Sequence, residues 1–147
     1  MRYSTLLVPL LGAICVIACA PATSRIGEFQ PFSSACDKSN EGQWIGVEGY
    51  LRLPDTITPG NTVELFLYRD LTFSGKPIGA TMPFGDGPNH AKRISSSFRD
   101  DDLKVYLADG TLVPFRTRVR LSGIMYYPIT PQDFDCGLKN LYVEAAK

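Results

Sequence analysis

The chain alternates apolar and polar residues over several stretches that begin at Trp44. A period of two residues is typical of a strand with one buried and one solvated face. The clearest cases are WIGVEGYLRL (44–53), TVELFLYRD (62–70) and RVRLSGIMYY (118–127). The side chains predicted to point inward are Ile45, Val47, Gly49, Leu51, Leu53, Val63, Leu65, Leu67, Val119, Leu121, Gly123 and Met125. These stretches therefore predict strands around a shared apolar core.

Shorter stretches extend the same architecture. We predict strands over PIGATMPF (77–84) and GLKNLYVEAA (137–146), the latter with Leu141, Val143 and Ala145 inward. In KVYLADGTLVPF (104–115), the pair Asp109-Gly110 between two apolar runs is a strong hairpin signal. Residues 85–101 are predicted as loop with room for one helical turn. The whole pattern predicts an all-β domain, a small antiparallel barrel of five or six strands with at most one short helix.

The first eighteen residues, MRYSTLLVPLLGAICVIA, have a different pattern. Arg2 precedes an apolar run from Leu6 to Ala18 that ends in small residues. A basic start, an apolar run of roughly 7–15 residues and a small-residue exit are typical of a secretory signal. The run is shorter than the about 20 apolar residues that a membrane-spanning helix needs. We therefore expect the chain to be exported.

The end of this run, Val16-Ile17-Ala18-Cys19, resembles the lipobox of bacterial lipoproteins. The resemblance implies cleavage before Cys19 and acylation of both its thiol and its new amine. The protein would then be anchored by lipid to the bacterial cell membrane or outer membrane, and the membrane would be a partner. Cys15 would lie in the discarded signal peptide. The alternative is an ordinary signal peptide that happens to contain a cysteine.

Composition and charge constrain the part of the chain after this leader. Residues 20–35, APATSRIGEFQPFSSA, show no periodicity, so the predicted division is a signal peptide (1–18), a flexible tether (19–35) and a folded domain (36–147). The chain has 15 basic and 15 acidic residues, and the loss of Arg2 leaves a formal charge of about −1. Proteins that bind nucleic acid through its phosphates are normally clearly basic, so nucleic acid is not expected as the main partner.

Two cysteines, Cys36 and Cys136, remain in the predicted domain. An isolated pair in an exported protein is most simply a disulfide. It would close a loop of about 100 residues, which the chain-entropy relation values at roughly 4–5 kcal/mol. The alternatives are two free buried thiols, or a metal site, which would need more ligands than the single His90 supplies. We predict no metal and no cofactor.

The strands WIGVEGYLRL, ELFLYRDLTFSGKPIGA, TRVRLSGIMYY and CGLKNLYVEAA resemble the successive strands of an OB-fold. The resemblance rests on V-x-G in the first strand, G-x-x-I before the third and V-R-x-x-G in the fourth, and it covers residues 44–146. The hairpin at 104–113 departs from the pattern, beside the place where this fold usually has its helix. The resemblance implies a closed barrel with a surface for oligonucleotides, oligosaccharides or proteins on its second and third strands.

Outward-facing aromatic and basic residues interleave on the predicted strands, as they do in stacking platforms. The candidate ligand-binding residues are Tyr50, Arg52, Phe66, Tyr68, Tyr106, Arg118 and Arg120. The alternative is that these side chains pair with one another and stabilise the outer face. The predicted function is a lipid-anchored binding module of the cell envelope for a protein, glycan or small molecule. The alternatives are an exported enzyme with an unrecognised site and a single-stranded nucleic-acid binder.

Other motifs predict structure rather than chemistry. GDGPNH (85–90) lacks the spacing of a phosphate-binding loop and is interpreted as a turn. Asp100-Asp101-Asp102 lacks the ligand spacing of a calcium loop and is interpreted as a solvated turn. His90 has no nucleophile at a catalytic spacing, so no catalytic residue is assigned. Trp44 is interpreted as a packing residue, with a ligand platform as the alternative.

Overall fold

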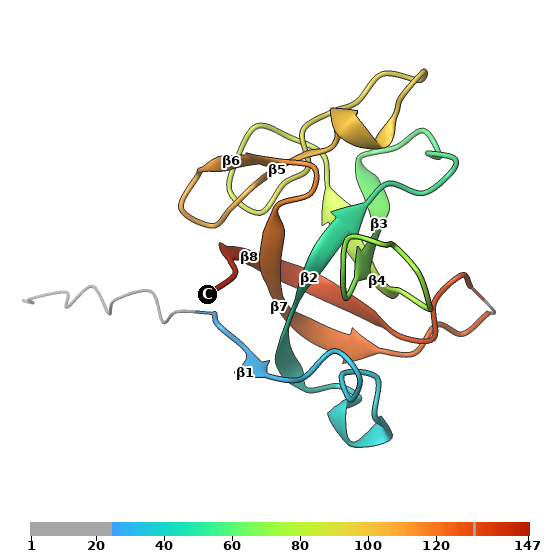
Figure 1. The fold of residues 1–147 in the computed structure, drawn as a ribbon, viewed down its shortest axis with the longest axis vertical. Coiled ribbons are helices and arrows are strands. Elements are labelled where there is room, and N and C mark those ends of the chain that lie inside the picture. The colour runs from blue at the N-terminus through green and yellow to red at the C-terminus, as the bar shows by residue number, and fades with distance from the viewer. Residues whose placement is uncertain (1–24, 131) are drawn as a thin grey trace, which may run out of the picture.

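A computed structural model describes residues 25–130 and 132–147, which fold around a closed barrel of five strands (Figure 1). The barrel strands are β2 (Trp44–Arg52), β3 (Thr62–Tyr68), β4 (Ile78–Pro83), β7 (Arg118–Tyr126) and β8 (Gly137–Ala145). They pair in the order β2-β3-β4-β8-β7, and β7 pairs back onto β2. Neighbours are antiparallel except β4 and β8, which are parallel. The predicted all-β, OB-like barrel is confirmed, but its sheet is mixed and not wholly antiparallel as predicted, because β4 and β8 run in the same direction.

The core lies inside the barrel and is built from alternate residues of each strand. On β2 and β3 the predicted inward residues Ile45, Val47, Leu51, Val63, Leu65 and Leu67 are all buried, as are Val119, Leu121 and Met125 on β7. β8 differs from the prediction, because Leu138 and Val143 are its core residues while Leu141 is only half-buried and Ala145 is exposed. The difference arises from an irregularity of the β7–β8 pairing at Asn140.

The stretch between β4 and β7 holds a hairpin and no α-helix among the described residues. β5 (Lys104–Tyr106) and β6 (Leu112–Pro114) form a separate two-stranded sheet around a turn in which Gly110 has φ +86°. Leu103, Val105 and Leu107 join the barrel core. The helical elements are two 3-10 turns, η1 (Lys38–Asn40) and η2 (Asp100–Asp102). In the described part of the chain, no helix has the length and apolarity needed to cross a membrane.

The segment before Cys36 packs on the barrel. β1 (Glu28–Phe29) runs parallel to the start of β2 and lies beside it in Figure 1. A Cβ at Gly27 would lie 2.3 Å from the backbone carbon of Ile45, so only glycine permits this approach. Ala35 is 1% exposed within the core. The fold therefore includes residues 25–35, which the sequence alone assigned to the flexible tether, and the domain begins before Cys36.

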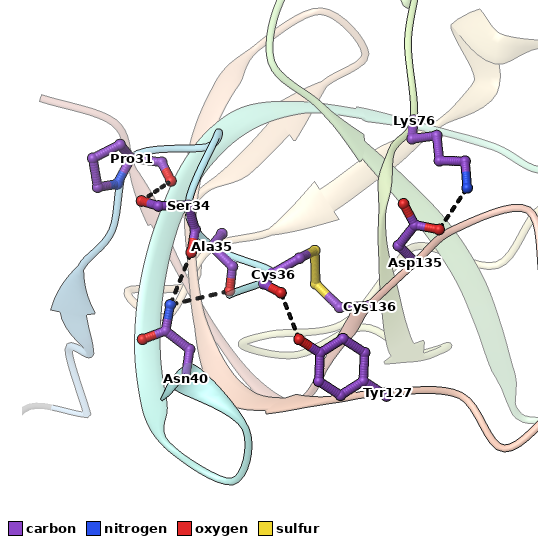
Figure 2. Close-up of a disulfide and its surroundings, with 9 residues drawn as sticks. All are labelled: Pro31, Ser34, Ala35, Cys36, Asn40, Lys76, Tyr127, Asp135 and Cys136. Carbon is purple, nitrogen blue, oxygen red and sulfur yellow. Dashed lines mark hydrogen bonds and ion pairs between the residues drawn. A yellow bond between two sulfur atoms is a disulfide. The ribbon is translucent and has the colours of Figure 1, made fainter. Parts of the chain in front are cut away.

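A disulfide joins Cys36 to Cys136, as predicted (Figure 2). It links the loop that precedes β2 to the residue that precedes β8, across 100 positions of sequence. The hydroxyl of Tyr127 donates a hydrogen bond to the carbonyl oxygen of Cys36 at 2.6 Å. Asn40 Nδ2 donates to the carbonyl oxygens of Ser34 and Ala35. The N-terminal loop is thus fixed to the barrel both covalently and by hydrogen bonds.

Candidate binding cleft

A cleft of about 810 Å³ opens on the outer face of the barrel. We call it the outer-face cleft; the residues that line it include Arg25, Trp44, Thr81, His90, Lys139 and Asn140. Its strand residues alternate with core residues: Trp44 precedes buried Ile45, and Lys139 comes directly after buried Leu138. A volume of this size falls in the range of about 300–1,000 Å³ that is usual for small-ligand sites.

Strand register brings the cleft side chains into one row. Trp44 on β2 stands opposite Ile124 on β7, which stands opposite Lys139 on β8. Thr81 comes two residues after Gly79 and Lys139 two residues after Gly137, and these glycines pair on the parallel strands β4 and β8. Thr81 in turn stands opposite Glu64 on β3. Residues distant in sequence thus meet because the barrel is closed.

A β-bulge in β8 brings two consecutive residues into the lining of the cleft. Ser122 pairs with Tyr142 and Ile124 with Lys139, so the single residue Gly123 faces both Asn140 and Leu141. Asn140 has φ +58°, a conformation that asparagine tolerates better than most residues. A Cβ at Gly123 would lie 2.7 Å from the carbonyl oxygen of Lys139. The bulge turns Asn140 and Leu141, consecutive residues, toward the cleft.

The N-terminal segment forms one wall of the cleft. Its Gly27 N–H donates to Oγ of the fully buried Ser122 at 2.9 Å, and the Gly27 oxygen accepts from Arg120 at 2.8 Å. The indole Nε1 of Trp44 donates to the carbonyl oxygen of Arg25 at 2.8 Å. These bonds hold Arg25 and Ile26 at the cleft and orient the Trp44 ring there.

The loop after β4 supplies two further polar residues. Asn89 has φ +62°, and its Oδ1 accepts a hydrogen bond from the Val143 N–H at 2.7 Å. Its amide nitrogen is therefore the group that it can offer a ligand. His90 Nδ1 lies 2.7 Å from the carbonyl oxygen of Pro88, which can only accept, so Nδ1 is the donor of this hydrogen bond. The loop GDGPNH thus forms a turn and also lines the cleft.

Glu64 lies at the end of the row, next to the cleft. Thr81 donates to its Oε2 at 3.1 Å, while Oε1 is buried without a hydrogen-bond partner among the described residues. Burial raises the pKa of the Glu64 carboxyl above its usual value, and the hydrogen bond from Thr81 partly opposes this. The ionised form is therefore disfavoured in the folded protein.

Glu64→Gln is expected to stabilise the domain at neutral pH. Because the folded-state pKa of Glu64 is raised, the stability that this group contributes is present at low pH and is lost as the pH rises through that pKa. The side chain keeps some contact with water, so the gain should be about 1 kcal/mol or less, and it should develop as the pH rises above the usual range of a glutamate carboxyl. Urea unfolding at several pH values measures it, with the exposed Glu41→Gln as control. A gain that is the same at every pH would contradict the assignment.

The structure distributes the predicted ligand-binding residues over the barrel instead of gathering them at the cleft. Arg52 Nε forms an ion pair with Asp100 at 2.9 Å, and this partner raises the pKa of the guanidinium. Arg118 pairs with Glu48 at 3.2 Å. Arg120 bonds the Gly27 carbonyl and lies over the Phe29 ring. Each of these arginines therefore has an internal partner.

The predicted aromatic residues are also engaged within the fold. Tyr68 is buried against Phe73, with ring centroids 5.5 Å apart, rather than exposed on the outer face. Phe66 lies 6.3 Å from the Phe134 ring, and the Tyr106 hydroxyl donates to Asp86 at 3.2 Å. Tyr50 stands between Tyr68 and Arg118 in the strand register. None of the predicted set belongs to the lining of the outer-face cleft, and Arg52 lines a separate cleft together with Asp100 and Arg116.

Two other predictions concern metals and the anchor. Asp100, Asp101 and Asp102 form the 3-10 turn η2 and bond locally. Within residues 25–130 and 132–147, no group of three or more His, Cys, Asp or Glu side chains is placed to hold a metal ion. Cys19, the predicted lipidation residue, lies outside the described residues.

No protein-family model, curated protein or solved structure matches this chain. Its function is therefore inferred from the chemistry of its own residues. His90 and Lys139 were not predicted to bind a ligand, and for Trp44 a ligand platform was only the alternative to packing. The closed barrel brings the three residues together. One local signal did exist: Leu138, Leu141 and Val143 are spaced by three and then two residues, which interrupts the alternation at the bulge.

Proposed function

We propose that the protein is a lipid-anchored binding module of the bacterial cell envelope, and that the outer-face cleft is its ligand site. The observation that carries the proposal is the short distance along the chain between Cys19 and the wall of the cleft. Its wall contains Arg25 and Ile26, and Arg25 comes only six residues after the lipobox cysteine Cys19. The exported chain would therefore present the cleft close to the membrane surface.

The lining of the cleft suits recognition of a partly polar ligand. Trp44, Ile26 and Leu141 offer apolar surface, while Asn89, Asn140 and Thr81 offer hydrogen-bonding groups. Ligand sites commonly combine a mainly apolar wall with a few placed polar groups. A glycan, a small molecule or a segment of an envelope protein each has this mixed chemistry.

The anchor proposed for Cys19 is energetically sufficient. Each buried methylene of an acyl chain contributes about 0.8 kcal/mol, and a single chain gives only marginal attachment. Acylation of both the thiol and the amine of Cys19 supplies more than one chain, so attachment would be stable.

Expression of the full chain in a bacterial host is expected to yield a mature protein that begins at Cys19 and carries acyl groups there. Mass spectrometry of the N-terminal peptide and partition into the membrane fraction measure this. Cys19→Ser should abolish both, whereas Cys15→Ser, in the segment removed, should leave both unchanged. A mature protein with an unmodified Cys19, or one cleaved elsewhere, would refute the anchor.

A further inference from the structure

The charge of the outer-face cleft differs from that of the chain as a whole. Arg25, Lys139 and His90 are the ionisable side chains in its lining, and all three are basic types. No aspartate or glutamate of the described residues belongs to that lining. The whole chain has equal numbers of acidic and basic residues, so this local excess does not reflect composition. The cleft therefore favours an anionic ligand.

Apolar surface lies next to these basic groups. Ile26 is 44% exposed and Phe29 is 50% exposed, and both belong to the N-terminal segment that forms the wall. Trp44 lines the cleft together with Ile26, and its indole N–H is bonded to the carbonyl oxygen of Arg25. Tryptophan is enriched where a protein meets the membrane–water interface, and surfaces that combine basic and apolar residues bind anionic membranes. The cleft and its rim have this combination.

The length of chain before Arg25 limits how far the cleft can lie from the anchor. Arg25 is six positions after Cys19, and an extended chain spans at most about 3.6 Å per residue. The cleft wall is therefore within about 22 Å of the lipid attachment point. This step rests on the proposed acylation of Cys19. An acylated protein would hold the cleft at the depth of the phospholipid headgroups or just above them.

We propose that the outer-face cleft binds the phosphate-bearing headgroup of an anionic phospholipid in the membrane that holds the anchor. Arg25 and Lys139 supply the positive charge, and the amides of Asn89 and Asn140 supply neutral donors. Trp44, Ile26 and Phe29 contact the glycerol and the first methylenes. Binding there orients the domain with β1 and the start of β2 facing the membrane.

Trp44 is the only tryptophan of the chain, so its fluorescence reports on the cleft directly. The protein for the test comprises residues 19–147 with Cys19→Ser, which retains every described residue, the core and the disulfide but has no acyl chain. It is titrated with vesicles of phosphatidylcholine alone and with vesicles in which a third of the lipid is phosphatidylglycerol. We expect a blue shift of Trp44 emission and quenching by brominated lipid only with the anionic vesicles, and a loss of both at high salt.

Lys139→Glu removes one positive charge from the cleft and adds one negative charge. Each of these two changes near an anionic surface corresponds to about 5-fold in affinity, so vesicle binding should weaken about 30-fold. Arg69→Glu is the matched control. Thr62, at the start of β3, lines the cleft, whereas Arg69 is exposed just after the end of β3, about 20 Å away along the strand. It should bind as the parent does. Thermal unfolding of both variants confirms that each is folded.

Three results would overturn the proposal. The first is equal binding to neutral and anionic vesicles, or to neither. The second is vesicle binding without any change in the emission of Trp44, which would place the contact on another face of the domain. The third is an equal Trp44 shift with free glycerol phosphate at the same phosphate concentration, which would make the cleft a site for a soluble phosphate ester. Because this protein has no acyl chain, its result is independent of whether Cys19 is lipidated.

Discussion

Leu65→Asp is expected to abolish the folded state of the domain. Leu65 is 0% exposed on β3, at the centre of the barrel core, between the buried Val63 and Leu67. A carboxylate there would have no partner, and an unpaired buried charge costs several kcal/mol even after the structure relaxes. The total stability of a domain is roughly 5–15 kcal/mol, so most of it would be lost. Circular dichroism and urea unfolding of the purified protein measure the effect.

Two further variants separate a loss of packing from the effect of charge. Leu65→Ala removes the same contacts without a charge and should cost about 2–5 kcal/mol, leaving a folded but weakened barrel. Thr62→Asp places the same carboxylate on an exposed position of the same strand and should change stability by about 0.5 kcal/mol or less. A folded Leu65→Asp protein with a normal midpoint would mean that the inward face of β3 has been misassigned.

The barrel could be predicted from the sequence because its core obeys a local rule. Ile45, Val47 and Leu51 alternate with outward residues on β2, and Asp109-Gly110 marks the hairpin that the structure contains. Such signals depend on neighbouring residues alone, so they can be read without knowing which strands pair. Closure of the barrel was implied by the OB-fold resemblance and agrees with the observed pairing of β7 with β2.

The cleft could not be predicted in the same way, because its parts are joined only by long-range pairing. Trp44 and Lys139 are separated by most of the chain and meet through Ile124 across two strand pairs. The wall at Arg25 exists because Gly27 permits the backbone to approach β2 closely. The sequence from 20 to 35 lacks periodicity, and the described part of it is held by hydrogen bonds to the barrel and by the single core residue Ala35.

The predicted ligand-binding residues show a related limit of sequence reasoning. An arginine on an outward strand position is equally suited to a ligand and to an internal partner, and the pattern cannot separate the two. Arg120 is a clear case: the N-terminal segment covers it, and its Nε has no hydrogen-bond partner among the described residues. Phe73, a positive-φ residue, covers Tyr68 from a loop that no periodicity describes.

Removal of the disulfide by Cys36→Ala together with Cys136→Ala should destabilise the domain by about 4–5 kcal/mol, because the unfolded chain regains the freedom of a 100-residue loop. That loss is a large share of the roughly 5–15 kcal/mol that a domain has, so the variant should be marginally stable or unfolded at growth temperature. The urea midpoint of the variant, compared with those of the oxidised and chemically reduced parent, measures the effect.

Tyr127→Phe provides the control for this experiment. It removes only the hydrogen bond from the Tyr127 hydroxyl to the Cys36 carbonyl, in the surroundings that Figure 2 shows, and should cost about 1 kcal/mol. If the cross-link acts through chain entropy, reduction of the parent and the double alanine variant should lower stability by similar amounts, since both free the same loop. A double variant much less stable than the reduced parent would instead assign the effect to packing around the fully buried Cys136. Equal midpoints for the oxidised and reduced parent would show that the bond leaves stability unchanged.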